Sequence, residues 1–68
     1  MEFRIKELRA KHRMSQEILA EKSGVSRTTI SGLESGEKKI TTTDTLMKIA
    51  KALCEPMSAV FSVDTDPH

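Results

Sequence analysis

Two neighbouring segments of the chain repeat one pattern that begins a helix. In each, an apolar residue precedes a serine and an aliphatic residue follows four positions after it: Met14, Ser15 and Leu19, then Val25, Ser26 and Ile30. The serine hydroxyl can accept from the free amides of the first turn, and the apolar pair can close over the helix start. The pattern predicts helices over 16–23 and 27–35, the second ending at Gly36.

The rest of the chain also shows helical periodicity, and no segment alternates with the period of two typical of a strand. We expect a first helix over about residues 2–12 and a fourth helix with Thr42 as its N-cap. Pro56 favours the start of a short fifth helix. The clearest amphipathic stripe lies in the fourth helix, and further apolar residues complete the expected core: Leu46, Ile49, Ala50 and Leu53, joined by Ile5, Leu8, Leu33, Met57, Val60 and Phe61. The prediction is an all-α fold, a compact bundle of five short helices.

Sixty-eight residues make one domain, which we place at 1–62, followed by a short flexible tail at 63–68. The single cysteine, Cys54, excludes an internal disulfide and is typical of a reducing cytosol. Because Cys54 follows the Leu53 end of the core stripe, we expect it to pack as a small hydrophobic residue. No apolar run is long enough to cross a bilayer, so we expect a soluble, cytoplasmic protein without membrane contact.

Charge is distributed unevenly although the net charge is only +1. Residues 1–39 carry nine Lys and Arg against six Asp and Glu, whereas residues 40–68 carry two against four. A basic amino-terminal part would suit an anionic partner, but ordinary surface charge would look the same. Charge alone therefore leaves the partner open.

The two capped helices and the short turn between them have helix-turn-helix spacing. Three positions suit that geometry: Ala20 is small where the helices must approach, Gly24 tolerates positive φ in the turn, and Ile30 is aliphatic where the second helix packs on the first. We assign the motif to residues 16–35.

These features together resemble the phage Cro/C1 repressor family of helix-turn-helix domains. The resemblance covers residues 3–62 and rests on Ile5-Lys6-Glu7-Leu8-Arg9, Ser15-Gln16-Glu17, Leu19-Ala20-Glu21, Ser23-Gly24-Val25-Ser26, Ile30-Ser31, Glu34, Gly36, Leu46, Ile49-Ala50-Lys51-Ala52-Leu53 and Val60-Phe61. It implies a lambda repressor-like DNA-binding domain from a bacterium or phage. The implied partners are double-stranded operator DNA and a second copy of the chain, and the implied role is transcriptional regulation, with repression from a palindromic operator as the expectation.

In the family, the third helix enters the major groove with its amino-terminal residues toward base edges. The matching residues here are Ser26, Arg27, Thr28 and Ser31. Arg27 can donate two hydrogen bonds to guanine. A solvated arginine is the alternative, but a cation in a first helical turn meets the helix dipole unfavourably, which favours an anionic partner. Thr28 would look the same as an ordinary surface residue.

The resemblance also implies contacts with the DNA backbone. Gln16 matches the family glutamine that bonds phosphate, and Lys38, Lys39 and Arg13 are further candidates, each of which could equally be a plain surface residue.

Arg9 and Glu34 match a family salt bridge across the domain, so their expected role, like that of Ala20, Gly24 and Ile30, is structural support of the motif.

Three residues depart from the family pattern. Gly32 stands where a long side chain often reaches DNA, so base recognition would rest on fewer side chains and more on DNA shape. Ile18 stands where polar residues are usual, and is either an isolated exposed residue or part of a partner surface. Thr41 stands where the family often has proline.

No group of residues has the spacing of a catalytic site, metal site or phosphate loop, so we expect no enzyme activity, cofactor or metal. Two alternatives to an operator-binding regulator remain. One is an antitoxin or protein-interaction module with the same fold, which would co-purify with an unrelated small protein. The other is a domain that assists another protein, which would bind DNA without sequence preference.

Overall fold

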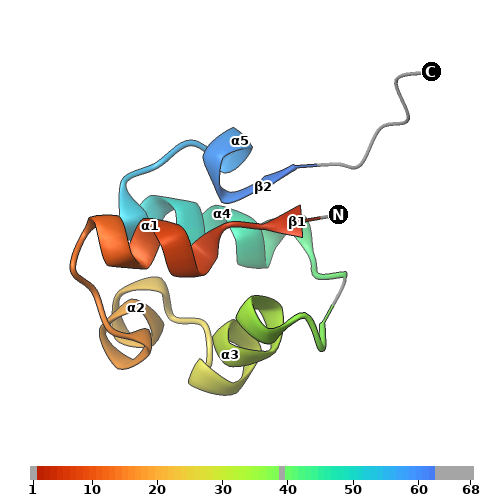
Figure 1. The fold of residues 1–68 in the computed structure, drawn as a ribbon, viewed down its shortest axis with the longest axis horizontal. Helices are drawn as coiled ribbons and strands as arrows, with labels where there is room; N and C mark the ends of the chain where they lie inside the picture. The colour runs from red at the N-terminus through yellow and green to blue at the C-terminus, as the bar shows by residue number, and fades with distance from the viewer. Residues whose placement is uncertain (1, 39, 63–68) are drawn as a thin grey trace.

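The computed structural model describes residues 2–38 and 40–62. These residues form five helices and two very short strands (Figure 1). In chain order they are β1 (Glu2–Phe3), α1 (Ile5–Lys11), α2 (Gln16–Ser23), α3 (Arg27–Ser35), α4 (Thr43–Leu53), α5 (Met57–Val60) and β2 (Phe61–Ser62). The predicted five-helix class is confirmed. Lys39 and the predicted tail at 63–68 lie outside the described residues.

The three predicted N-caps all form. The side chain of Ser15 accepts from the Ile18 amide at 3.1 Å, Ser26 from Thr29 at 3.2 Å, and Thr42 from Thr45 at 3.2 Å. Each bond satisfies an amide that has no partner within its own helix, which explains why α2, α3 and α4 begin where they do.

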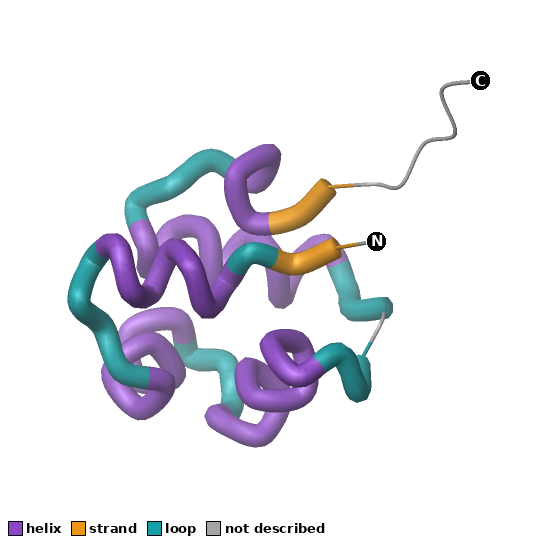
Figure 2. The backbone as a smooth tube through the Cα atoms, viewed as in Figure 1, coloured by secondary structure: helices purple, strands orange, loops and turns teal. Residues whose placement is uncertain are grey.

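The two ends of the domain pair as strands, which the helical reading of the sequence missed. Glu2 lies opposite Ser62 and Phe3 opposite Phe61 in an antiparallel register, and the Arg4 amide donates to the Val60 carbonyl at 2.7 Å. Figure 2 shows the two strands side by side. The expected first helix therefore begins at Ile5 instead of Glu2. The pairing satisfies backbone groups at both ends while the phenylalanine side chains pack on the core.

The core is aliphatic and is shared by all five helices and the turn before α3. Ile5, Leu19, Val25, Ile30, Leu33, Leu46, Ile49, Ala50, Leu53 and Val60 are buried. Helix α4 contributes four of them and packs against α2, α5 and α1, while α3 packs against α2 and α1. In Figure 1, α2 and α3 lie on the opposite side of α1 and α4 from α5 and β2. The fold therefore leaves one side of the α2–α3 pair uncovered by other helices.

Cys54 corrects one expectation. It is exposed, because it forms the C-cap of α4 in a left-handed conformation with φ 56°. The chain leaves the helix axis at this residue, directly after buried Leu53, so the side chain turns away from the core stripe.

Within the described residues, no helix combines the length and apolarity needed to cross a bilayer.

Burial predicts a contrast between two isoleucines. Ile30 is fully buried on α3, whereas Ile40, in the connection to α4, is 81% exposed. Replacing Ile30 by valine removes one core methylene and should lower the free energy of unfolding by about 0.5–1.5 kcal/mol. Ile40→Val is the matched control and should leave it unchanged. Urea denaturation monitored by circular dichroism would measure both, and equal effects would contradict the core assignment.

Candidate nucleic-acid interface

The turn between α2 and α3 depends on the conformation of one glycine. Gly24 caps α2 with φ 75°, and a Cβ added to it would meet no atom within 4 Å. Conformation, and not lack of space, therefore selects glycine here. Ala20 is partly buried against the core, and Ile30 is fully buried. These three predicted support residues lie where the two helices meet.

Helix α3 has a buried face and an exposed face. Ile30 and Leu33 anchor the buried face, while Arg27, Thr28 and Ser31 are exposed. The outer face is therefore rigidly held by packing behind it. Because its exposed side chains are polar, this face suits contact with a polar partner better than burial in an apolar interface.

Ser26 precedes this helix and its hydroxyl is already engaged. The Oγ accepts from the Thr29 amide and donates to the Thr29 hydroxyl at 2.8 Å. A contact from Ser26 to a base would have to share or replace these bonds.

Two adjoining hollows run beside the outer face of α3. The larger, of about 400 Å³, is lined by Gln16, Arg27, Thr28, Ser31, Gly32 and Glu37. The second, of about 240 Å³, is lined by Lys6, Arg9, Gln16, Ser31, Glu34 and Ser35. Gln16 and Ser31 line both, so the start of α2 and the middle of α3 lie on one surface. We call the outer face of α3 and these hollows the α3 surface.

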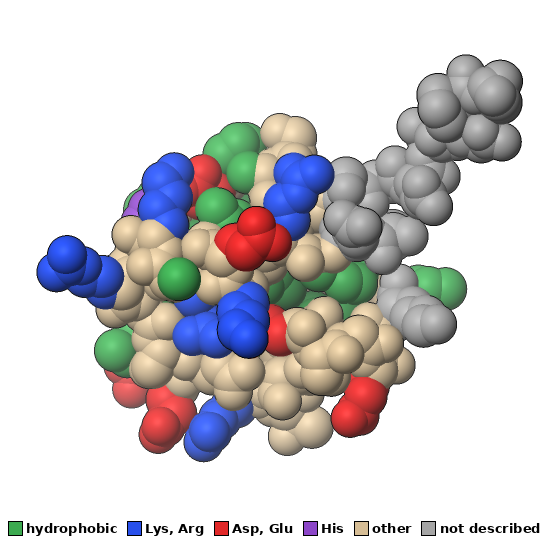
Figure 3. Space-filling view, viewed as in Figure 1, with side chains coloured by type: hydrophobic (Ala, Val, Ile, Leu, Met, Phe, Trp, Pro, Cys, Tyr) green, Lys and Arg blue, Asp and Glu red, His purple; other side chains and the backbone are tan. Residues whose placement is uncertain are grey.

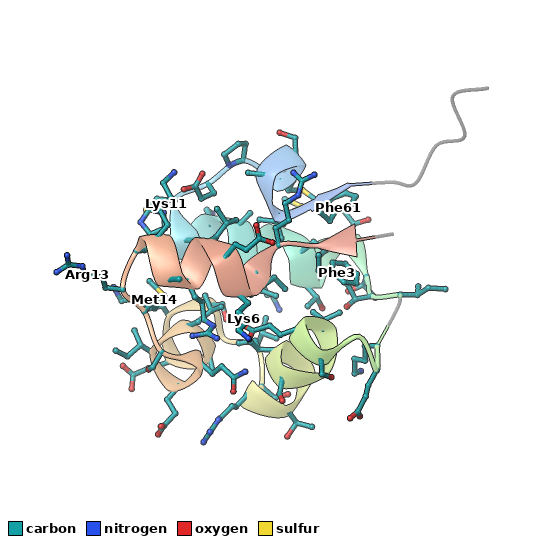
Figure 4. The ribbon with its side chains drawn as sticks, viewed as in Figure 1. Phe3, Lys6, Lys11, Arg13, Met14 and Phe61 are labelled. Atoms are coloured by element: carbon teal, nitrogen blue, oxygen red, sulfur yellow. The ribbon has the colours of Figure 1, made fainter. Side chains whose placement is uncertain are left out.

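Lys6 is a member of the α3 surface that sequence reasoning missed. Figure 4 shows its side chain extending from α1 toward α2 and α3. Its position three residues before Arg9 in the same helix places both on one helical face, which was a usable signal. Figure 3 shows Lys and Arg side chains at the centre of this view, where α1 meets the α2–α3 pair.

Arg13 lies apart from the residues that line the hollows. It has φ 53° in the connection between α1 and α2, and its side chain points away from the body of the domain (Figure 4). Lys38 is exposed in the segment after α3, next to Glu37, which lines the larger hollow. Lys39 lies outside the described residues.

A salt bridge between Arg9 and Glu34 joins α1 to α3, as the resemblance implied. Arg9 Nε lies 2.6 Å from Glu34 Oε2, and Arg9 Nη2 donates to Glu34 Oε1 at 2.8 Å. Arg9 Nη1 donates to the Met14 carbonyl at 2.9 Å, and Gln16 Nε2 donates to Glu34 Oε1 at 3.0 Å. The side chains of Arg9 and Glu34 are only 16% and 6% exposed. One carboxylate thus connects α1, the start of α2 and the end of α3.

This network changes the acidity of both partners. Hydrogen bonding to Glu34 raises the pKa of Arg9. Burial acts to raise the pKa of Glu34, but hydrogen bonds from Arg9 and Gln16 and the nearby positive charges of Arg9 and Lys6 together hold it below its usual value. Glu34 is therefore ionised at neutral pH and keeps its partners in place.

Gln16 is oriented by this network and can still donate a second hydrogen bond from its side-chain amide. A primary amide carries two N–H groups, and only one is needed for Glu34 Oε1. The second N–H, and the first amides of α2, can donate to an anion placed at this helix start.

Arg27 has a loose intramolecular partner. Its Nη1 lies 3.9 Å from Glu17 Oε1, and the two side chains are 62% and 77% exposed. Such an exposed pair contributes little to stability. Arg27 can therefore leave Glu17 for an external acceptor at low cost.

A second polar cluster fastens the other end of α1. Glu55 Oε2 lies 2.7 Å from His12 Nε2 and 3.0 Å from Lys11 Nζ. Hydrogen bonds from His12 and Lys11 lower the pKa of Glu55. No group of three or more His, Cys, Asp or Glu in the described part of the chain is placed to hold a metal ion.

Comparison with known proteins places the chain in a family and finds a similar solved structure. The family model for helix-turn-helix domains matches residues 5–57. The crystal structure of the restriction-modification controller protein C.AhdI from Aeromonas hydrophila is similar, with a TM-score of 0.78 and 34% sequence identity over 85% of this chain and 86% of that one. The comparison with curated proteins gave no match.

Breaking the Arg9–Glu34 pair from one side should destabilise the domain. Arg9→Met would leave the Glu34 carboxylate largely buried without its cation, at a cost near the lower end of about 3–5 kcal/mol, because Arg9 keeps some exposure. The double variant Arg9→Met/Glu34→Leu should recover most of that loss. Lys48→Met, which breaks an exposed pair with Asp44, is the control and should cost less than about 1 kcal/mol. Urea unfolding at pH 7 measures all three, and a double variant less stable than Arg9→Met would contradict the pairing.

Stability should also fall in acid. Glu34 and Glu55 have folded pKa values below their ordinary value, which is about 4.3 in an unfolded chain. Their contribution is therefore complete above that value and is lost as pH falls through the lower folded pKa. Unfolding free energy measured from pH 7 to pH 3 should decline below about pH 4.3, and the decline should be shallower in Glu34→Gln. An unchanged acid profile in that variant would refute the role of Glu34.

Proposed function

Because this chain belongs to the Cro/C1-type helix-turn-helix family of DNA-binding transcriptional regulators, we propose that it binds a palindromic operator as a homodimer and represses transcription. One observation carries the proposal. The outer face of α3 is polar and exposed, while its inner face is fixed to the core by Ile30 and Leu33. A helix held in this way can enter a major groove without any rearrangement of the bundle.

In this proposal Arg27 supplies most of the direct base recognition. It stands in the first turn of α3, is largely exposed, and has only the loose pair with Glu17 to give up. A guanidinium can donate to O6 and N7 of guanine together, which discriminates by about 1–3 kcal/mol against other bases. Thr28 and Ser31 are short, exposed hydroxyl residues on the same face and would make secondary contacts with bases or phosphates.

The phosphate backbone would be held on both sides of α3. Gln16 and the first amides of α2 would bind one phosphate, with Lys6 close by. Lys38, and Lys39 beside it in the sequence, would bind another on the far side of the larger hollow. Arg13 points outward from the α1–α2 corner, so we assign it at most a peripheral phosphate. Such contacts position the protein without specifying sequence.

A dimer follows from the small number of bases that one short helix can contact. Two copies would place their α3 helices about 34 Å apart, one turn of DNA. The exposed Met47 on α4, 54% accessible, supports that helix as part of the dimer surface, whereas Met57 is partly buried against the core. The similar Aeromonas protein is a restriction-modification controller, which supports a regulatory role for this chain, and we place that role in the bacterial cytoplasm with the DNA.

Arg27 and Lys38 should respond differently to substitution. After selection of a preferred site from random DNA, Arg27→Ala should lose preference at one position of each half-site, costing about 1–3 kcal/mol there. Lys38→Ala should weaken all duplexes equally and reduce the salt slope by about one. Lys11→Ala, on α1 and paired with Glu55 away from the α3 surface, is the charge-matched control and should do neither. Unchanged preference at every position in Arg27→Ala would remove Arg27 from base recognition.

A further inference from the structure

Gly32 lies in α3 at a point where a side chain would press on the stem of Lys38. A Cβ built on Gly32 would lie 3.2 Å from Lys38 Cγ, 3.4 Å from its Cδ and 3.7 Å from its Cβ. The first distance is shorter than ordinary van der Waals contact. Gly32 is not one of the glycines with positive φ, which are Gly24 and Gly36. The local conformation therefore accepts other residues, and a side chain at position 32 would have to displace the Lys38 stem.

A hydrogen bond between the two backbones holds Lys38 next to Gly32. The Lys38 amide donates to the Gly32 carbonyl at 3.0 Å, after the chain reverses at Gly36 with φ 89°. The Ser35 hydroxyl donates to the same carbonyl at 3.3 Å, and the Glu37 amide donates to that hydroxyl at 3.4 Å. Because the close atoms are Cβ, Cγ and Cδ, a side chain at position 32 would shift the Lys38 stem near its backbone end, where a small displacement is enlarged at the ammonium.

The contact lies on the surface that we assign to DNA. Gly32 lines the larger hollow together with Arg27, Thr28 and Ser31. The stem of Lys38 thus occupies the space beside α3 that a longer side chain at position 32 would fill. Lys38 is nevertheless exposed as a residue.

We propose that Gly32 is a positioning residue: its bare backbone seats the alkyl stem of Lys38 along α3, so that the Lys38 ammonium is directed to a phosphate of duplex DNA. The inference rests on the proposed DNA-binding function and adds a role for a glycine that touches no base. A lysine displaced from this seat would no longer hold its ammonium at the phosphate, so the contact and its share of the salt dependence would be lost. Gly32→Ala should release the lysine although alanine favours helix over glycine.

A double-variant cycle separates this role from a direct clash between position 32 and DNA. The proteins are wild type, Gly32→Ala, Lys38→Met and the double variant; methionine keeps most of the stem and removes the charge. Each is titrated onto one fixed 24-base-pair duplex by fluorescence anisotropy at salt concentrations from about 50 to 200 mM, a range over which phosphate contacts change affinity strongly. Urea unfolding of each protein reports whether the folded fraction changes.

Lys38→Met should lower the salt slope by about 0.9, equivalent to roughly eightfold in affinity at 0.1 M salt for one phosphate contact. Gly32→Ala should lose about two- to eightfold in affinity, reduce the slope in the same direction, and unfold at no lower urea concentration than wild type. In the Lys38→Met background, Gly32→Ala should change neither affinity nor slope.

An equal loss from Gly32→Ala in both backgrounds would show that the added methyl clashes with DNA directly, and would overturn the inference. An unchanged salt slope in Gly32→Ala would overturn the inference too. This holds even if the variant is less stable, because a smaller folded fraction lowers the apparent affinity without removing a phosphate contact. Absence of salt-dependent binding by the wild type would instead refute the proposed function.

Discussion

The Glu34 carboxylate is the point at which the three helices around the α3 surface are joined. It accepts from Arg9 on α1 and from Gln16 at the start of α2, while it belongs to the last turn of α3. Its burial would be costly without these donors, because an unpaired charge in a low-dielectric setting is strongly unfavourable. The orientation of α3 relative to the start of α2 is therefore fixed by a charge pair as well as by the aliphatic core.

This arrangement links stability to the proposed function. The side chain that would meet phosphate, Gln16, is oriented by the same carboxylate that holds α3 in place. Arg27, in contrast, is restrained only by a long, exposed pair with Glu17. The α3 surface thus combines a rigid frame with a loosely restrained arginine, which suits the proposed binding of the DNA backbone in a fixed register with Arg27 adjusting to a base.

Much of the fold could be predicted from the sequence because its signals are local. The caps Ser15, Ser26 and Thr42 act on amides three residues away, and all three form as expected. The pairing of Phe3 with Phe61 could not be predicted, since it joins the chain ends and each strand is two residues long, too short for any periodicity. Cys54 was wrongly assigned to the core because one left-handed residue ends the helical pattern there.

The sequence indicated residues of the α3 surface but not how they are arranged. Arg27, Thr28, Ser31 and Gln16 gather on one surface, and Lys6 could have been added from its spacing to Arg9. The contact between Gly32 and Lys38 depends on the path of the chain after Gly36. The sequence therefore showed only that position 32 has no side chain, whereas the structure shows that the Lys38 stem lies against it.

The central claim is that α3, supported by α2, presents its outer face to DNA. Titration of the ¹⁵N-labelled protein with a duplex, followed by amide chemical shifts, tests it most directly. We expect the largest changes at residues 27–32 and at Gln16 and Glu17, with small changes in α5 and β2. Changes confined to α5, Phe61 and the Glu55 cluster, with α3 unaffected, would contradict it.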